Sequence, residues 1–226
     1  MSDYDQFGKD YFQNRHGNDR LRQLSFMKEK KYLISFVGRD IFETGTLLDV
    51  GCSTGEFIDA IGWHKTRAFG MEVSSYARGV AEKKGIKFEK GLFNSENFFD
   101  LIVFRGTIQY LPNPFEYIQR AFVCLKKSGH VVFLATPNSN SPYYFLFKTL
   151  PFLEEKLNFL IPSNASLSMN LKNVGFEIVN IDYPYIGSPY ANVMTDHLRF
   201  VRKLIFRTDD RFAFWRSSMN VLARKP

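Results

Sequence analysis

The sequence predicts a single α/β domain in which strands and helices alternate around a doubly wound sheet. Short apolar runs alternate with amphipathic segments from Thr46 to Ala135, which is the pattern that such a sheet requires. A glycine turn follows the first apolar run, at the position where open α/β sheets bind ligands. A chain of 226 residues fits one such domain with an added cap, and it is long enough to bury a full core.

The first elements are a helix and a buried strand. A helix is expected over residues 21–37, where mostly apolar residues recur at mostly helical spacing. These residues are Leu21, Leu24, Met27, Lys31 and Ile34. Leu47, Leu48 and Val50 are apolar enough for a parallel strand covered on both faces. Asp49 interrupts this run just before the turn, so its carboxylate is expected to point out of the strand's carboxyl end.

Later segments continue the alternation. We expect strands near residues 69–73, 98–104, 130–135, 174–179 and 218–224, and a helix over 115–125 followed by a turn over 126–129. Two segments break the pattern, namely 139–173, which contains three prolines and an aromatic group, and 184–214. Because insertions on an α/β scaffold commonly carry the residues that select a ligand, we expect specificity to reside in these two segments.

The segment 45–57 encodes a strand, a tight turn and a helix start in thirteen residues. Gly51 allows a positive φ and a close approach of the backbone to a ligand. Ser53 and Glu56 have the spacing of a capping box, so the turn is expected to open directly into a helix. The segment therefore has the organisation of a loop that binds a nucleoside cofactor.

The identity of that cofactor follows from what the loop lacks. A dinucleotide fingerprint would need small residues where this loop has Ser53 and Glu56, and a glutamate would stand near two phosphate charges. NAD and FAD are therefore disfavoured, and the phosphate-loop motif with its lysine is missing. S-adenosyl-L-methionine suits the loop better, because its sulfonium and ammonium fit Asp49 and its carboxylate could bind amides at the helix start.

The loop and the segments after it resemble class I S-adenosylmethionine-dependent methyltransferases. Residues 69–74, 98–115 and 115–138 resemble the family's later strand and loop units, and they occur in the family's order. The resemblance implies a Rossmann-like fold with a mostly parallel seven-stranded sheet, one antiparallel strand and helices on both faces. It also implies a single domain over 1–226, in which residues 1–44 form a helical lead-in over the cofactor.

The resemblance also assigns the cofactor site. Glu72 lies about 20 residues after the glycine turn at the end of the next strand, which is where a ribose diol lies. Adenine would rest on Leu92 and Phe93, because the aspartate that the family often has nearby is missing. The expected cofactor-binding residues are Tyr11, Arg15, Asp49, Gly51, Cys52, Ser53, Thr54, Gly55, Glu72, Val73, Leu92, Phe93, Arg105, Gly106 and Gln109.

The resemblance implies methyl transfer to a small acceptor, and we expect a sugar hydroxyl of a glycan or nucleotide-sugar precursor. Two alternatives stay open: a lipid-like or prenylated aromatic acceptor, suggested by the aromatic insertion, and a protein that binds the cofactor without turnover. Where many relatives have a histidine, this chain has Gln109-Tyr110-Leu111. Tyr110 and His197 are the candidate bases, and His16 is a further histidine in the lead-in.

Composition limits the partners. The net charge is +7 and the pI is near 9.3, but the basic residues are scattered, which argues against nucleic acid. The basic amphipathic stretch 199–207 is either a helix packed on the domain with its arginines outward, or a contact with an anionic acceptor or a membrane surface. The polar, acidic start of the chain and its two isolated cysteines predict a cytoplasmic protein. No cluster has metal-ligand spacing, so no metal is expected.

Overall fold

The structure is a computed structural model that describes residues 19–88, 95–151, 153 and 158–226. The helices are α2 (Asp19–Val37), α3 (Ile41–Thr44), α4 (Glu56–Ile61), α5 (Ser75–Lys83), α6 (Pro114–Cys124), α7 (Pro142–Phe147), α8 (Asn164–Val174) and α9 (Val193–Phe206), with short 3-10 turns η1 (Lys65–Arg67) and η3 (Ile108–Tyr110). The strands are β1 (Leu47–Val50), β2 (Ala68–Met71), β3 (Phe99–Arg105), β4 (Leu125–Pro137), β5 (Glu177–Asp182) and β6 (Ser218–Arg224).

In the described part of the chain, six strands form one sheet in the order β2-β1-β3-β4-β6-β5. Neighbouring strands from β2 to β4 are parallel, whereas β6 runs antiparallel to both β4 and β5. The expected seventh strand is not confirmed. Lys87 makes an isolated parallel bridge to Phe69 beside the edge strand β2, and the residues that follow, 89–94, lie outside the described residues.

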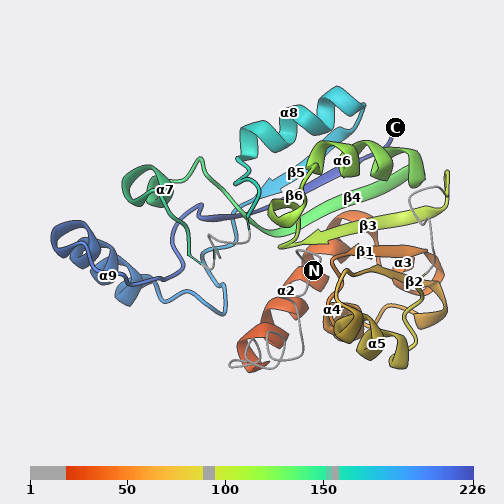
Figure 1. The fold of residues 1–226 in the computed structure, drawn as a ribbon, viewed down its shortest axis with the longest axis horizontal. Helices are drawn as coiled ribbons and strands as arrows, with labels where there is room; N and C mark the ends of the chain where they lie inside the picture. Colours follow the sequence, from red (N-terminus) through yellow and green to blue (C-terminus); the bar gives the residue numbers. More distant parts are fainter. Residues whose placement is uncertain (1–18, 89–94, 152, 154–157) are drawn as a thin grey trace.

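Helices cover both faces of the sheet (Figure 1). On one face α6 and α8 pack on a cluster built from alternate strand residues such as Leu48, Phe104 and Phe133. On the other face α2, α3, α4 and α5 pack on the intervening residues, among them Leu47 and Val103. Because the parallel strands are buried on both faces, they read as continuous apolar runs, as the sequence predicted.

Two local predictions need correction. The expected turn over 126–129 belongs to the long strand β4, in which Ser128 takes a positive φ and the pairing with β3 shifts register nearby. In α2, the predicted inner residues Leu24 and Met27 are exposed, and Phe26, Glu29 and Leu33 are buried instead. The buried face of α2 contains the charged Glu29 because this face covers a polar site. The spacing of apolar residues alone cannot identify such a face.

A third apolar cluster lies beyond the end of the sheet and forms the core of the cap. It contains Tyr143 and Leu150 from the first insertion, and Phe212 and Phe214 from the segment before β6. Figure 1 shows α7 and α9 projecting from the sheet at this end. In contrast, α8 of the first insertion packs against β5 and β6 and belongs to the main domain.

Candidate functional site

A cavity of about 940 Å³ lies at the carboxyl ends of β1, β3 and β4 and extends under α2 and the cap. Open α/β sheets bind ligands at this edge. Eight residues of the predicted site line it. They are Asp49, Gly51, Cys52, Ser53, Arg105, Gly106, Gln109 and Tyr110. The sequence therefore located one half of the cavity, and the cap supplies the other half.

Asp49 is the buried acid of the site. Its side chain lies on the α2 face of β1, and its Oδ1 has no hydrogen-bond partner among the described residues. Burial raises the pKa of its carboxyl to about 7, against a smaller lowering by Arg105. An acid in this condition favours a cation that it can contact, because the cation offsets the cost of desolvating the carboxylate.

The glycine loop approaches its neighbours so closely that side chains are excluded. A Cβ on Gly51, whose φ is +76°, would lie 2.6 Å from the side chain of Thr107. The Gly51 and Cys52 amides donate to the Met71 carbonyl oxygen at 2.8 and 3.1 Å, which binds the loop to the end of β2. These two amides are consequently already paired, and they are not free to bind a carboxylate.

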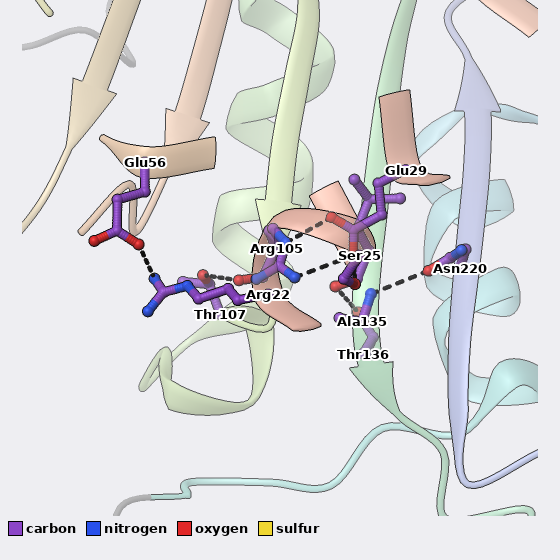
Figure 2. A network of polar contacts seen from close by, with 10 residues as sticks. Arg22, Ser25, Glu29, Glu56, Arg105, Thr107, Ala135, Thr136 and Asn220 are labelled. Carbon is purple, nitrogen blue, oxygen red and sulfur yellow. Dashed lines mark hydrogen bonds and ion pairs between the residues drawn. The ribbon is translucent and has the colours of Figure 1, made fainter. Parts of the chain in front are cut away.

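Glu72 fastens the same loop from the end of β2. Its two carboxylate oxygens accept the Ser53 and Ser74 amides, each at 2.9 Å. The expected capping box is wrong, because α4 begins after Gly55 at positive φ and has no side-chain cap. Glu56 instead accepts a hydrogen bond from Thr54 and pairs with Arg22 of α2 at 3.0 Å (Figure 2).

Arg105 is held by α2 at the end of β3. Its Nε and Nη2 donate to the two carboxylate oxygens of Glu29 at 2.7 and 3.1 Å, which makes a two-pronged ion pair (Figure 2). The guanidinium also lies 4.5 Å from the centre of the Phe26 ring. Burial lowers the pKa of Arg105, but the charge and hydrogen bond of Glu29, together with the nearby Tyr190 and Asp49, outweigh burial, so the net shift of the pKa is upward. The pair therefore fixes α2 over the cavity.

The cap side of the cavity is largely aromatic. Tyr183, Tyr185 and Trp215 line it together with Phe214. The Tyr185 and Trp215 rings lie 4.8 Å apart, and the Tyr185 hydroxyl donates to the buried carboxylate of Asp196 at 3.2 Å. Polar side chains from Lys28, Asp182, Arg211 and Asn220 complete the wall. Such a wall accommodates the flat faces of a ring.

The two candidate bases have different surroundings. Tyr110 lines the cavity from the short turn after β3, next to Gln109, whose amide nitrogen donates to the Gly106 carbonyl at 3.0 Å. His197 is not among the cavity-lining residues. Its Nδ1 lies 2.6 Å from the Val193 carbonyl oxygen, and its Nε2 accepts from the Trp215 indole at 3.1 Å. Both ring nitrogens of His197 are thus engaged within the cap.

The remaining predicted residues do not line the cavity or are not described. Thr54, Gly55, Glu72 and Val73 are not among the residues that line the cavity, and Val73 is exposed. Tyr11, Arg15, Leu92 and Phe93 lie outside the described residues, as does His16.

Sequence reasoning missed the residues that α2 contributes. Arg22, Phe26, Glu29 and Leu33 recur at intervals of three and four, which places them on one helix face. A charged and apolar stripe of this kind is a usable signal for a helix that covers a polar site. It was obscured by the more numerous apolar residues on the outer faces of the same helix.

The comparisons with known proteins decide the family. The sequence profile of a family described as a methyltransferase domain matches residues 20–181. The chain belongs to this methyltransferase family. Among curated relatives, the ubiquinone biosynthesis O-methyltransferase of Azoarcus sp. strain BH72 is 27% identical over 168 residues, which cover 64% of this chain and 71% of the relative.

Solved structures of methyltransferases share the fold. A SAM-dependent methyltransferase from Thermotoga maritima superposes with a TM-score of 0.63 at 17% identity, covering 98% of this chain and 97% of that chain. A SAM-dependent methyltransferase from Archaeoglobus fulgidus gives a TM-score of 0.60 at 18% identity, covering 89% and 95%. The expected S-adenosylmethionine-dependent methyltransferase and its cofactor are confirmed. The expected resemblance to glycan and nucleotide-sugar enzymes is not shown by these relatives.

Two further observations concern the described residues alone. They contain no group of three or more His, Cys, Asp or Glu side chains arranged to hold a metal ion. None of their helices is long and apolar enough to cross a membrane.

Proposed function

We propose that this methyltransferase transfers the methyl group of S-adenosylmethionine to a hydroxyl of a small acceptor that carries an aromatic ring. The observation that carries the proposal is one continuous cavity, with the buried Asp49 at one end and the aromatic cap wall at the other. A cofactor held at the first end would present its methyl group toward an acceptor at the second end.

The residues at the first end fit the cofactor. The unpartnered Oδ1 of Asp49 would bind the cofactor's ammonium, and Gly51, which lines the same cavity, presents no side chain toward it. Each oxygen of Glu72 accepts one backbone amide, and a carboxylate oxygen can accept a second donor such as a ribose hydroxyl. When bound, S-adenosylmethionine supplies a sulfonium methyl group that is intrinsically reactive toward a nucleophile. The protein then has to orient the acceptor and exclude water.

The side chains that could act as a general base in the cavity favour a phenol as acceptor. A phenol has a pKa of about 10, as tyrosine does, whereas a sugar hydroxyl is far less acidic and needs more help to lose its proton. The described residues that line the cavity include no histidine, and the other candidates, carboxylates such as Asp182 and the phenol of Tyr110, are weak bases toward a sugar hydroxyl. A phenolic hydroxyl therefore matches this cavity better than a sugar hydroxyl does. The relative from Azoarcus supports an oxygen acceptor, because its name describes an O-methyltransferase of ubiquinone biosynthesis.

A sugar derivative is the second candidate, and the cations of the cavity favour it. Lys28 and Arg211 line the cavity and would attract a negatively charged group, whereas Arg22 is paired with Glu56. Arg211 also donates from Nη1 to the Leu153 carbonyl at 2.9 Å, so this cation has a fixed position on the wall.

A matched pair of acceptors separates these candidates. The purified chain is incubated with S-adenosylmethionine carrying an isotopically labelled methyl group, and with catechol or its saturated counterpart cyclohexanediol. Mass spectrometry then detects any methylated product. We expect methyl transfer to catechol and much less to cyclohexanediol. Transfer to the saturated ring or to a nucleotide sugar, with none to catechol, would reject the phenol. Cofactor binding without a methylated product across a broad acceptor panel would favour a protein that binds without turnover.

A further inference from the structure

Helix α9 has its polarity reversed relative to an ordinary surface helix. Its inner face carries Asp196, which is 1% exposed, and the buried Lys203. Its outer face carries Met194, Leu198 and Ile205, which are 75%, 67% and 63% exposed. A surface helix of a soluble domain normally turns its apolar stripe toward the core. One interpretation of the stretch 199–207 was a packed helix with its arginines outward, and the structure places an apolar stripe on the outside of this helix as well.

Specific bonds hold α9 in this orientation. Asp196 accepts hydrogen bonds from the Tyr185 hydroxyl at 3.2 Å and from the Asn192 amide at 2.8 Å. Lys203 donates from Nζ to the carbonyl oxygens of Thr208 and Asp210 at 2.8 and 3.2 Å. Rotating the helix to bury its apolar stripe would break these bonds and would expose the inner aromatic contacts. The outward direction of the stripe is therefore built into the cap.

The apolar surface extends over the whole length of α9 and onto its neighbour. We define the α9 outer face by its exposed apolar residues, which are Val193, Met194, Leu198, Val201, Leu204, Ile205 and Phe206. At the same end of the molecule, α7 exposes Phe145 and Leu146 (Figure 1). The two helices meet at Phe147 and Phe200, whose ring centres lie 5.4 Å apart. An exposed apolar helix face of this size marks an interaction surface.

The charges beside this face indicate what covers it. Arg199, Arg202 and Arg207 are exposed. The one acid of α9 is the buried Asp196, which lies 3.9 Å from the Arg199 guanidinium and leaves no exposed acid on this helix. Two copies of α9 packed against each other would bring these cations together without exposed acids from the same helix to neutralise them. An anionic lipid surface would neutralise them and would also take up the apolar side chains.

We propose that the outer face of α9 docks on an anionic lipid bilayer, with the helix lying in the plane of the membrane interface. Asp196 connects α9 to Tyr185 in the cavity wall, and Phe200 of α9 stacks on Phe214 in the same wall at 4.2 Å. Docking would thus place the aromatic end of the cavity beside the lipid surface. This proposal stands on the surface of α9 alone, and it holds whether the acceptor is a phenol or a sugar derivative.

Vesicle sedimentation tests the proposal with the full chain. The vesicles contain phosphatidylcholine alone or phosphatidylcholine mixed with phosphatidylglycerol. We expect binding to the mixed vesicles that weakens as salt is raised, and little binding to phosphatidylcholine alone. The double variant Leu198→Gln/Ile205→Gln should lower partitioning about ten-fold or more, because two exposed apolar side chains no longer enter the lipid. Arg202→Gln should lower it by roughly five-fold.

The control is Met169→Gln, which removes an apolar side chain that is 57% exposed on α8, away from the cap. It should partition as the wild type does. All variants change exposed side chains outside the cavity, and cofactor binding by calorimetry should remain unchanged in each. The proposal is overturned if the wild type does not bind the mixed vesicles, or if the α9 variants bind them as tightly as the wild type does. It is also overturned if sedimentation velocity shows a dimer that Leu198→Gln/Ile205→Gln dissociates while vesicles bind neither protein.

Discussion

The buried acid Asp49 should make cofactor affinity depend on pH in a defined window. Its pKa is about 7 in the unliganded protein, and contact with an ammonium group should lower that value. Because the ionised acid binds the cation, affinity should rise as the pH rises toward 7. With a pKa of about 7, roughly 3% of Asp49 is ionised at pH 5.5 and about half at pH 7, which gives about a 16-fold gain in affinity.

Calorimetry with the demethylated product of the cofactor can measure this gain without turnover. An α-amino group titrates near 7.7–8.0, so the ligand keeps its ammonium charge between pH 5.5 and 7. The described cavity-lining residues include no histidine that would titrate in the same window. Asp49→Asn is the matched variant, since it keeps the shape of the side chain and cannot ionise. Its affinity should be weaker than that of the wild type at pH 7 and nearly flat across the window.

Folding stability gives an independent reading of the same acid. Asp49 holds its proton more tightly in the folded protein than in the unfolded chain, because its pKa is higher in the folded state. The protonated form therefore stabilises the fold fully at a pH below the unfolded pKa, and this stabilisation is gone once the pH exceeds the folded pKa. The unliganded wild type should therefore lose stability relative to Asp49→Asn as pH rises from about 4, the ordinary pKa of an aspartate, to about 7, with no further loss above that, and ligand should restore it. A wild-type affinity that is flat from pH 5.5 to 7, or a slope that persists in Asp49→Asn, would refute the role assigned to this acid.

Three further predictions concern the rest of the cavity. Glu72→Ala should weaken cofactor binding by about 1.5–3 kcal/mol, roughly ten- to 150-fold when measured by calorimetry. The variant loses a charged hydrogen bond and the side chain that anchors the glycine loop. Unchanged affinity would remove the assignment of Glu72 to the ribose. Tyr110→Phe should slow single-turnover methyl transfer only moderately. His197→Ala should leave the pH profile of that transfer unchanged, because both ring nitrogens are engaged in the cap; loss of the acidic limb of the profile in His197→Ala would contradict this. Glu29→Gln should destabilise the fold by about 1–3 kcal/mol, a thermal shift of several degrees, because Arg105 loses its partner; an unchanged melting temperature would show that this pair does not hold α2.

The strand and loop elements could be predicted because their residues encode local geometry. The final strand β6 has the bounds that its apolar residues indicated, and β1 and the glycine loop lie where Asp49 and Gly51 placed them. Apolar runs of this length leave few alternatives in an α/β chain, and a close backbone approach needs glycine. The cofactor half of the cavity was therefore accessible from the sequence.

The other half was not accessible, because it depends on which side of a helix meets its neighbours. Glu29 faces inward only because Arg105 ends β3 beneath it, 76 positions later in the chain. In the same way α9 turns Asp196 inward because its carboxylate accepts hydrogen bonds from the Tyr185 hydroxyl and the Asn192 amide. Periodicity identifies two faces of a helix but assigns the inner one by apolarity, so it fails when long-range polar partners decide the orientation.

The separate apolar core of the cap has a consequence for how this enzyme can diversify. Tyr143, Phe212 and Phe214 belong to a cluster that shares no residue with the two clusters that enclose the sheet. Substitutions within one cluster and within another should then add nearly independently in their cost. With the acceptor placed against the cap as proposed above, residues of the cap cluster can change at the expense of the cap, while the glycine loop and its anchoring acids stay in place. An evolving lineage, or a laboratory selection, could exchange acceptors on this scaffold without rebuilding the part that holds the methyl donor.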